Sequence, residues 1–203
     1  AQAGCSLAQI ANAALDAALT GFEFAAGIPG TLGGAVVMNA GAYGGEMKDV
    51  LTSVRVMTEE GEIMELPAEK LGLGYRTSII PEKRYIVLGA VISLTEGKKE
   101  EIKAQMDDLR QKRVSKQPLE YPSAGSTFKR PEGYFAGKLI QDSGLKGFTV
   151  GGAQVSEKHS GFVINKGNAT AADVMELIRQ VTAKVKEDTG VTMEPEVKQI
   201  GEF

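Results

Sequence analysis

The sequence of 203 residues has almost no cysteine or histidine, with one of each, Cys5 and His159. A single cysteine excludes an intrachain disulfide and is typical of a reducing compartment. One histidine and one cysteine also argue against a His/Cys metal site, so no bound metal is expected. No apolar run approaches the roughly 20 residues that span a bilayer, and no signal peptide is visible, so a cytoplasmic location is expected.

An excess of charge of one sign is also missing. The 23 lysine and arginine residues face 26 acidic residues, for a net charge of −3. This balance argues against a general nucleic-acid-binding protein. Hydrophobic residues make up 42% of the chain, an ordinary share for a globular protein with a core. The length suits one large domain or two small ones.

Glycine, by contrast, is abundant in one segment. Residues 25–45 contain seven glycines among small, almost uncharged residues. Each glycine weakens a helix or a strand, so neither a strong helix nor a regular strand is expected here. Bare backbone N–H groups could instead approach the phosphates or the ring edge of a ligand. The spacing matches neither the Rossmann turn nor the P-loop, and tight turns that pack a strand on a helix explain the glycines equally well.

The rest of the chain alternates short strand and helix patterns, which predicts an α+β fold. Ser6 and Gln9 form a capping box ahead of a first helix. Thr170 and Asp173 form another ahead of a helix that ends at Gly190. The other predicted elements are helices over residues 96–117 and 135–142, a loop over 73–78, and strands over 53–57, 62–66, 84–94, 161–165 and 193–201.

Four motifs follow one another along the chain: Gly-Ile-Pro-Gly-Thr-Leu-Gly-Gly-Ala with Met-Asn-Ala-Gly-Ala-Tyr-Gly, Tyr-Arg-Thr-Ser at 75–78, Ala-Gly-Ser-Thr-Phe at 124–128, and Glu-Pro-Glu-Val at 194–197 with Ile-Gly at 200–201. Together they resemble the UDP-N-acetylenolpyruvoylglucosamine reductase (MurB) family, from about residue 3 to residue 201. Any one motif is weak, but four in the right order are specific. The short interval between Arg76 and Ser126 resembles the family's compact type, which lacks an inserted substrate-covering loop.

The resemblance implies the remaining part of a PCMH-type FAD-binding domain plus a smaller C-terminal α+β substrate-binding domain. Residues 1–95 would form the second subdomain of the FAD-binding domain, 96–118 a connecting helix, and 119–203 the substrate-binding domain. The implied reaction is that of an NADPH-dependent, FAD-containing UDP-N-acetylmuramate dehydrogenase. It reduces the enolpyruvyl group of a UDP-sugar in peptidoglycan precursor synthesis. The UDP-sugar is the expected partner, and no nucleic acid, membrane or obligatory protein partner is expected.

The resemblance also assigns three catalytic residues. Hydride addition to an alkene conjugated with a carboxylate moves negative charge onto that carboxylate, and this charge needs a fixed partner. By resemblance Arg76 and Glu196 take this role, Glu196 in its protonated form, and Ser126 is the proton donor. A serine hydroxyl is a weak acid and protonates only a strongly basic centre. Taken singly, the three could be a loop arginine, a turn serine and an exposed carboxylate, but their joint placement in matching motifs favours catalysis.

Two further sets of residues are expected from the resemblance. Those that would line the flavin pyrophosphate and ring are Gly27, Ile28, Pro29, Gly30, Thr31, Gly33, Gly34, Asn39, Ala40 and Gly41. Those that would lie near the substrate are Tyr75, Lys129, Arg130, Lys138 and His159. Lys138 is expected at the diphosphate. His159 is expected as a polar substrate contact, although an exposed histidine on a strand approach fits the pattern equally well.

The sequence departs from the family's pattern at its N-terminus. Members carry roughly 90–100 further residues there, the size of a domain, including a second glycine-rich turn that ends in Gly-Ser-Asn and holds the FAD pyrophosphate. This chain is therefore expected to bind FAD weakly or not at all and to lack reductase activity by itself. Two alternatives remain: a UDP-sugar-binding module without redox activity, and another flavoprotein of the superfamily such as an alcohol oxidase. The latter has no reason to hold Ser126 and Glu196 together.

Overall fold

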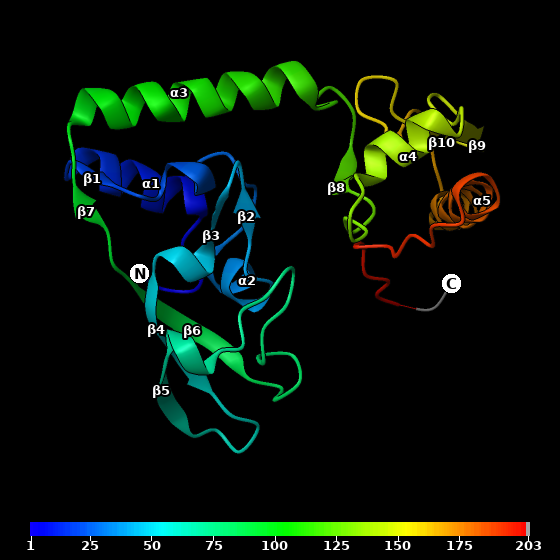
Figure 1. Ribbon diagram of the computed structural model, residues 1–203. Coiled ribbons are helices and arrows are strands. Elements are labelled where there is room, and N and C mark those ends of the chain that lie inside the picture. Colours follow the sequence, from blue (N-terminus) through cyan, green and yellow to red (C-terminus); the bar gives the residue numbers. More distant parts are fainter. Residues whose placement is uncertain (202–203) are drawn as a thin grey trace. The chain divides into compact units, whose positions relative to one another are not determined.

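The computed structural model describes residues 1–201, and the chain divides into two compact units (Figure 1). Unit 1 comprises residues 1–113 and unit 2 begins at Val114. Helices and strands occur in both units, so the predicted α+β class is confirmed. Among the described residues, no helix combines the length and the apolar character that crossing a bilayer requires.

Unit 1 is built on a three-stranded antiparallel sheet in the order β5-β4-β6. Helix α2 packs against β6 (Figure 1). Two-stranded pairs β1-β7 and β2-β3 complete the unit. Its elements are α1 (Leu7–Asp16), β1 (Leu19–Thr20), η1 (Glu23–Ala25), α2 (Leu32–Val37), β2 (Gly41–Ala42), β3 (Gly45–Glu46), η2 (Met47–Asp49), β4 (Leu51–Met57), β5 (Ile63–Pro67), η3 (Ala68–Lys70), β6 (Ile86–Ile92), β7 (Thr95–Glu96) and most of α3 (Lys99–Lys116).

Local signals account for several of these elements. The Ser6 hydroxyl accepts the Gln9 N–H at 3.2 Å and the Gln9 side chain accepts the Ser6 N–H at 2.9 Å, so the predicted capping box of α1 is confirmed. In β4, Val54 and Val56 are buried and Arg55 between them is exposed. Such alternation places one face of the strand on the core. The strands predicted over residues 53–57 and 62–66 correspond to β4 and β5, whose ends differ from the prediction by one or two residues.

The sequence predicts neither a strong helix nor a regular strand in the glycine-rich segment, and the elements that form there are short. Helix α2 runs through Gly33 and Gly34, and a short hairpin, β2-β3, begins at Gly41. The Gly33 N–H donates to the Ala3 carbonyl at 2.9 Å, and a Cβ on Gly33 would lie 3.1 Å from the Ala3 Cβ. Tertiary hydrogen bonding and close packing therefore stabilise a six-residue helix that its own propensity disfavours.

Unit 2 contains a four-stranded antiparallel sheet in the order β8-β11-β10-β9. Helix α5 packs against α4 and against the β9-β10 hairpin. It begins with the predicted Thr170–Asp173 capping box and ends at Gly190, which has a φ of +74°. The elements are β8 (Ser123–Ser126), α4 (Ala136–Asp142), β9 (Thr149–Val150), β10 (Ala153–Val155), β11 (Phe162–Asn165) and α5 (Ala171–Thr189).

The predicted final strand over residues 193–201 is wrong. In its place a single bridge pairs Phe128 with Pro195. The Lys129 N–H donates to the Glu194 carbonyl at 2.9 Å, and the Glu196 N–H donates to the Thr127 carbonyl at 2.8 Å. Proline has no N–H to contribute to a ladder, and no named strand forms around it. The segment is nevertheless tied to the residues that follow β8.

Candidate functional site

Arg76 lies at the tip of a tight turn in unit 1. Gly74 and Thr77 exchange backbone hydrogen bonds of 3.2 and 3.3 Å, so Tyr75 and Arg76 are the two residues between them. Arg76 has a φ of +55°, a conformation that glycine adopts at lower cost. Residues with side chains persist in this region only where their surroundings restrain them.

The Arg76 side chain extends toward the glycine-rich segment. Its Nη2 lies 3.5 Å from the Gly41 carbonyl oxygen, which makes a long hydrogen bond. Its Cζ lies 5.0 Å from the centroid of the Tyr75 ring, within range of a cation–π contact. Arg76 is half-buried, while Tyr75 is half exposed. The guanidinium is therefore placed between an aromatic ring and the β2-β3 hairpin.

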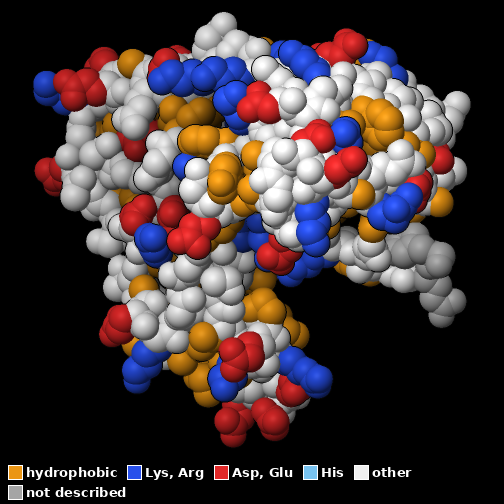
Figure 2. All heavy atoms as spheres, turned by 45° about the vertical axis from the view of Figure 1, so that its right-hand side comes forward, with side chains coloured by type: hydrophobic (Ala, Val, Ile, Leu, Met, Phe, Trp, Pro, Cys, Tyr) orange, Lys and Arg blue, Asp and Glu red, His pale blue; other side chains and the backbone are white. Residues whose placement is uncertain are grey.

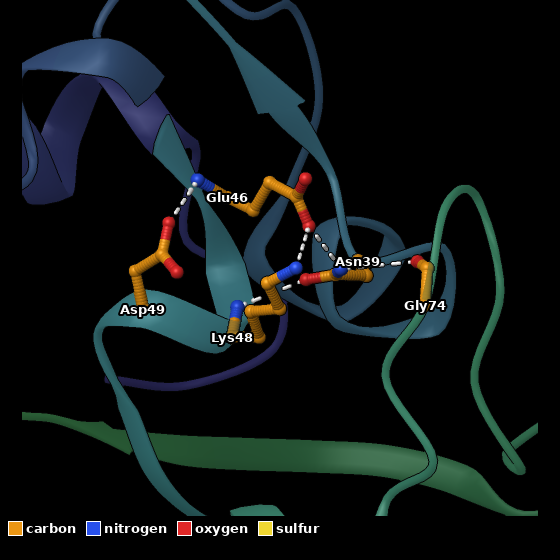
Figure 3. A network of polar contacts seen from close by, with 5 residues as sticks. All are labelled: Asn39, Glu46, Lys48, Asp49 and Gly74. Atoms are coloured by element: carbon orange, nitrogen blue, oxygen red, sulfur yellow. Dashed lines mark hydrogen bonds and ion pairs between the residues drawn. The ribbon is translucent and has the colours of Figure 1, made fainter. Parts of the chain in front are cut away.

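Asn39 connects this turn to the hairpin (Figure 3). Its side chain is buried, and its Nδ2 donates to Glu46 Oε2 at 2.7 Å and to the Gly74 carbonyl at 3.0 Å. Its Oδ1 accepts the Lys48 N–H at 2.9 Å. Both amide donors and the acceptor are thus used within the protein. The assignment of Asn39 to the cofactor stays a prediction, and its side chain has a structural task that the motif alone did not reveal.

Glu46 adds a negative charge to the same network. Lys48 Nζ lies 3.0 Å from its carboxylate. This ion pair, with smaller contributions from the Asn39 amide and the Arg76 charge, lowers the pKa of Glu46 from its usual value, against the opposing effect of burial. Glu46 is therefore ionised at neutral pH, and its field favours the position of the Arg76 guanidinium.

The glycines of the segment fall into two groups, and one group is open. Gly30 and Gly34 are exposed, and a Cβ added to either would have no heavy-atom neighbour within 4 Å. Gly30 has a φ of +144°, which favours glycine. Gly27, Pro29 and Thr31 are exposed as well. Bare backbone covers this surface, as a close approach to a ligand requires.

The other group is closed by packing. A Cβ on Gly41 would lie 2.6 Å from the Gly45 carbonyl oxygen, and one on Gly45 would lie 2.6 Å from the Phe24 ring. Neither distance is compatible with a side chain. Tight packing, one of the two interpretations open from the sequence, therefore accounts for Gly41 and Gly45, and open backbone remains the better description of Gly30 and Gly34.

Arg113 is a residue near this segment that sequence reasoning missed. A Cβ on Gly27 would lie 2.9 Å from Arg113 Nε, and Arg113 Cζ is 6.0 Å from the Tyr43 ring centroid. Helix α3 thus brings a cation to a segment that has no lysine between Gly27 and Gly45. The available signal was its helical spacing from Ile102, which is buried on the same helix.

In unit 2, Ser126 ends β8 and lies opposite Phe162. It is exposed, and its hydroxyl makes a long hydrogen bond of 3.4 Å to the Phe128 carbonyl. The next residue, Thr127, is buried, and its Oγ1 accepts the Val163 N–H at 3.0 Å. The Thr127 N–H donates to the Gly161 carbonyl at 2.8 Å. The backbone beside Ser126 is therefore fixed, and its hydroxyl faces outward with only a weak internal partner.

Glu196 lies at the same edge of unit 2. Its N–H bond to the Thr127 carbonyl and the Phe128–Pro195 bridge place it across from the residue that follows Ser126. Glu196 is half-buried. The structure thus brings two of the three predicted catalytic residues to neighbouring positions on paired backbone segments. Arg76 belongs to unit 1.

His159 is half-buried rather than exposed, and its role as a substrate contact stays a prediction. Its Nδ1 accepts the Gly161 N–H at 3.1 Å, and its ring contacts Phe162 edge-on with centroids 4.9 Å apart. Burial lowers the pKa of His159. The neutral ring accepts at Nδ1, so Nε2 carries the proton. A Cβ on Gly161 would lie 2.9 Å from His159 Cε1 and 3.6 Å from Ser126 Oγ, so these two side chains flank the glycine.

Two predicted substrate residues have partners within unit 2. Lys129 forms an ion pair with Glu194. Lys138 contacts both carboxylate oxygens of Asp142 at 2.8 Å, one turn along α4. Exposed pairs of this kind contribute little to stability and exchange readily for another anion. On the face drawn in Figure 2, basic and acidic side chains are interspersed.

Arg130 belongs to an aromatic cluster instead. Its Nε donates to the Tyr134 carbonyl at 3.2 Å, and its Cζ lies 4.0 Å from the Phe135 ring centroid. Both aromatic side chains are exposed. Arg130 and the Phe135 ring thus form an exposed cation–π pair. Within residues 1–201, no group of three or more His, Cys, Asp or Glu side chains is placed to hold a metal ion.

Comparison with protein-family models gives two matches. Residues 1–67 match an FAD binding domain, and residues 117–200 match the C-terminal domain of UDP-N-acetylenolpyruvoylglucosamine reductase. The predicted order of a flavin domain and a C-terminal domain of this family is thereby confirmed.

Whole-chain comparison agrees. A UDP-N-acetylenolpyruvoylglucosamine reductase of Agathobacter rectalis is 64% identical over 203 residues, which are 100% of this chain and 65% of the relative. One from Caldanaerobacter subterraneus is 61% identical over 202 residues, covering 100% of this chain and 67% of the relative. A crystal structure of the reductase (MurB) from Thermus caldophilus superimposes with a TM-score of 0.86 at 41% identity, over 97% of this chain and 70% of that one. The chain thus spans about two thirds of the length of the relatives that it matches.

Proposed function

Because the chain belongs to the UDP-N-acetylenolpyruvoylglucosamine reductase family, we propose that it acts in the reduction of UDP-N-acetylglucosamine enolpyruvate to UDP-N-acetylmuramate. In this proposal FAD is the cofactor, NADPH the hydride donor, and the product a precursor of peptidoglycan. The observation that supports it most is the placement of Glu196 beside Ser126, which a flavoprotein with another substrate does not need. The single cysteine is consistent with a reducing compartment, so we assign the reaction to the cytoplasm.

The residues of unit 1 fit a dinucleotide cofactor. The open backbone around Gly30 and Gly34 leaves room for phosphate oxygens to approach main-chain N–H groups. Arg113 supplies a positive charge at Gly27, where the diphosphate would otherwise meet only neutral groups. When bound, FAD would supply the hydride that saturates the double bond. Gly27, Gly30, Gly34 and Arg113 are the residues we assign to holding it.

The substrate's carboxylate needs a partner once hydride adds to the terminal carbon, because negative charge then spreads onto it. We assign this role to Arg76 and Glu196. The guanidinium is held in a strained turn and needs little reorganisation, which is what stabilises a developing charge most. Ser126 then donates its hydroxyl proton to the other carbon. Because that hydroxyl has only a 3.4 Å internal hydrogen bond, it is available to turn toward the substrate.

The basic residues of unit 2 are assigned to the UDP-sugar. Lys138 can exchange Asp142 for a diphosphate oxygen, and Lys129 can do so with its own acidic partner. His159 presents an Nε2–H donor of fixed tautomer. Tyr75 and Arg130 complete the proposed set, each with a planar surface for a ring or carboxylate.

Calorimetry and kinetics test the proposal together. The chain is titrated with UDP-N-acetylglucosamine and then with FAD, and the Agathobacter rectalis relative is measured in parallel. We expect saturable UDP-sugar binding. In the flavin-loaded protein, Ser126→Ala should leave flavin reduction by NADPH intact and slow reoxidation by the enolpyruvyl sugar at least 100-fold, a typical contribution of a general acid at about 10²–10⁴.

Ser123→Ala, on the same strand, is the matched control and should change neither step. Equal loss of both half-reactions in Ser126→Ala would contradict the proton-donor role. UDP-sugar binding by the chain, with no FAD uptake in the titration and no turnover of the enolpyruvyl sugar, would support the alternative of a binding module without redox activity.

A further inference from the structure

Asn39 and Arg76 are linked by a chain of contacts that the proposed chemistry leaves unassigned. We propose that Asn39 is a positioning residue for Arg76, acting through the Gly74 carbonyl at the base of the turn that carries the guanidinium (Figure 3). The inference rests on the proposed function for its kinetic consequence. Its structural part, the restraint of the turn, stands independently of any reaction.

The backbone supports this inference first. Asn39 and Arg76 have φ values of +46° and +55°. Residues with side chains persist in this region only where the surroundings restrain them. Asparagine tolerates the left-handed conformation better than most residues, whereas arginine has no such preference. The arginine must therefore be restrained by contacts outside its own turn, and the Asn39–Gly74 hydrogen bond is such a contact.

The chemistry of the carboxamide is the second support. One buried group joins three segments: the β2-β3 hairpin through Glu46, η2 through the Lys48 N–H, and the turn through Gly74. Two donors and an acceptor are needed at once, and an asparagine side chain provides them where an aspartate provides only acceptors. Because Asn39 is 1% exposed, water cannot replace a lost partner.

The far end of Arg76 supplies the third support. The Gly41 carbonyl contacts its Nη2, and Glu46 is close enough for the arginine charge to act on it. Glu46 is itself held by Asn39. The amide therefore holds the backbone of the turn through Gly74, and it also holds Glu46, whose charge acts on the guanidinium. A guanidinium held in this way needs less reorganisation when the substrate carboxylate becomes charged.

Amide hydrogen exchange of the chain tests the restraint directly. Asn39→Asp keeps the acceptor for Lys48 and the tolerance of positive φ, but it loses both donors. We expect exchange at Thr77 to accelerate roughly five- to tenfold, the effect of one lost hydrogen bond, and exchange at Lys48 to change little. Asn168→Asp is the matched control, an exposed asparagine with a φ of +56°, and should leave Thr77 unchanged.

A double variant distinguishes the effect of the contact to the turn from the effect of the contact to the hairpin. In Asn39→Asp/Glu46→Gln the glutamine amide can donate to the new carboxylate, which restores the link between positions 39 and 46 and not the one to Gly74. We expect fast exchange at Thr77 to persist. Restoration of slow exchange would overturn the proposal, because the hairpin alone would then hold the turn. Glu46→Gln by itself keeps the Asn39–Gly74 bond, so slow Thr77 exchange is expected even if the variants that carry Asn39→Asp fail to fold.

Kinetics of the flavin-loaded protein test the consequence. Asn39→Asp should lower kcat with the enolpyruvyl sugar roughly tenfold, a larger loss than in the rate of flavin reduction by NADPH. Asn39→Gln, which keeps the amide at greater length, should recover part of kcat. Equal losses in both half-reactions would refute positioning of Arg76. If Thr77 exchange changes as expected and kcat does not, the restraint is real and the role proposed for Arg76 in the reaction is wrong.

Discussion

Replacing Gly161 by alanine should move the imidazole of His159. The added Cβ would lie 2.9 Å from His159 Cε1, closer than such atoms approach, and 3.2 Å from Nδ1, which is also a tight contact. The ring has to rotate away, and the 3.1 Å hydrogen bond from the Gly161 N–H to Nδ1 is then lost. Such a bond contributes about 0.5–1.5 kcal/mol to stability, so the variant should be less stable by about 1 kcal/mol at pH 7.

Rotation of the ring should also change the pKa of His159 in a definite direction. Burial lowers the pKa of His159 below its ordinary 6.5. A displaced ring gains solvent, so the pKa in Gly161→Ala should rise toward 6.5. A histidine whose pKa is lower in the folded than in the unfolded protein contributes stability at pH values above its unfolded pKa. This stability is lost as the pH falls through the folded pKa. The original protein should therefore lose more stability than the variant when the pH falls below about 6.5.

NMR titration of the single histidine measures this pKa without assignment, since the chain has no other imidazole. Urea unfolding at pH 7 and pH 5.5 measures the stability difference. Gly167→Ala is the matched control, because its added Cβ would meet no heavy atom within 4 Å and its φ is not positive. An unchanged His159 pKa in Gly161→Ala, with the Nδ1 hydrogen bond intact, would refute the steric reasoning.

Three other outcomes follow from particular contacts. Gly45→Ala should destabilise unit 1 by about 2 kcal/mol or more, because its Cβ would lie 2.6 Å from an aromatic ring. Gly34→Ala, whose Cβ would lie in open space on a helix, should be neutral or stabilising by up to about 1 kcal/mol. Urea unfolding of both variants compares the two effects. Thr127→Val should cost about 1–3 kcal/mol because the buried Val163 N–H loses its acceptor, whereas Thr127→Ser keeps it and should cost about 1 kcal/mol; equal losses would contradict this account. The lowered pKa of Glu46 contributes stability at neutral pH that is lost as the pH falls below about 4.5, and Glu46→Gln should flatten that part of an acid unfolding curve.

The family resemblance and much of the secondary structure could be predicted from the chain alone. Capping boxes join residues three positions apart, and the alternation of buried and exposed residues in β4 arises within one strand. Both signals depend on neighbours in the sequence. The prediction of a final strand over residues 193–201 is wrong because a local pattern of apolar and β-branched residues does not ensure strand pairing. Pro195 offers no N–H, and only one bridge forms there.

The candidate site could be predicted only in part. Four motifs named Arg76, Ser126 and Glu196, but the contacts that place them join distant positions. Asn39 bonds to a carbonyl 35 residues further on, and Arg113 reaches Gly27 from the far end of α3. The Asn39 contact leaves no periodic trace, because its partner is a backbone carbonyl that every residue possesses, and the helical spacing of Arg113 does not say which segment it meets.

The amino-acid sequence by itself determined the capped helices, the alternating strands and the family to which the chain belongs, since all three depend on side-chain types at fixed spacing. Only the tertiary structure decided which glycines are open and which are packed, which cation meets the glycine-rich segment, and what restrains the Arg76 turn. These outcomes depend on distances between segments far apart in the chain, and such distances are set by the packing of the whole unit.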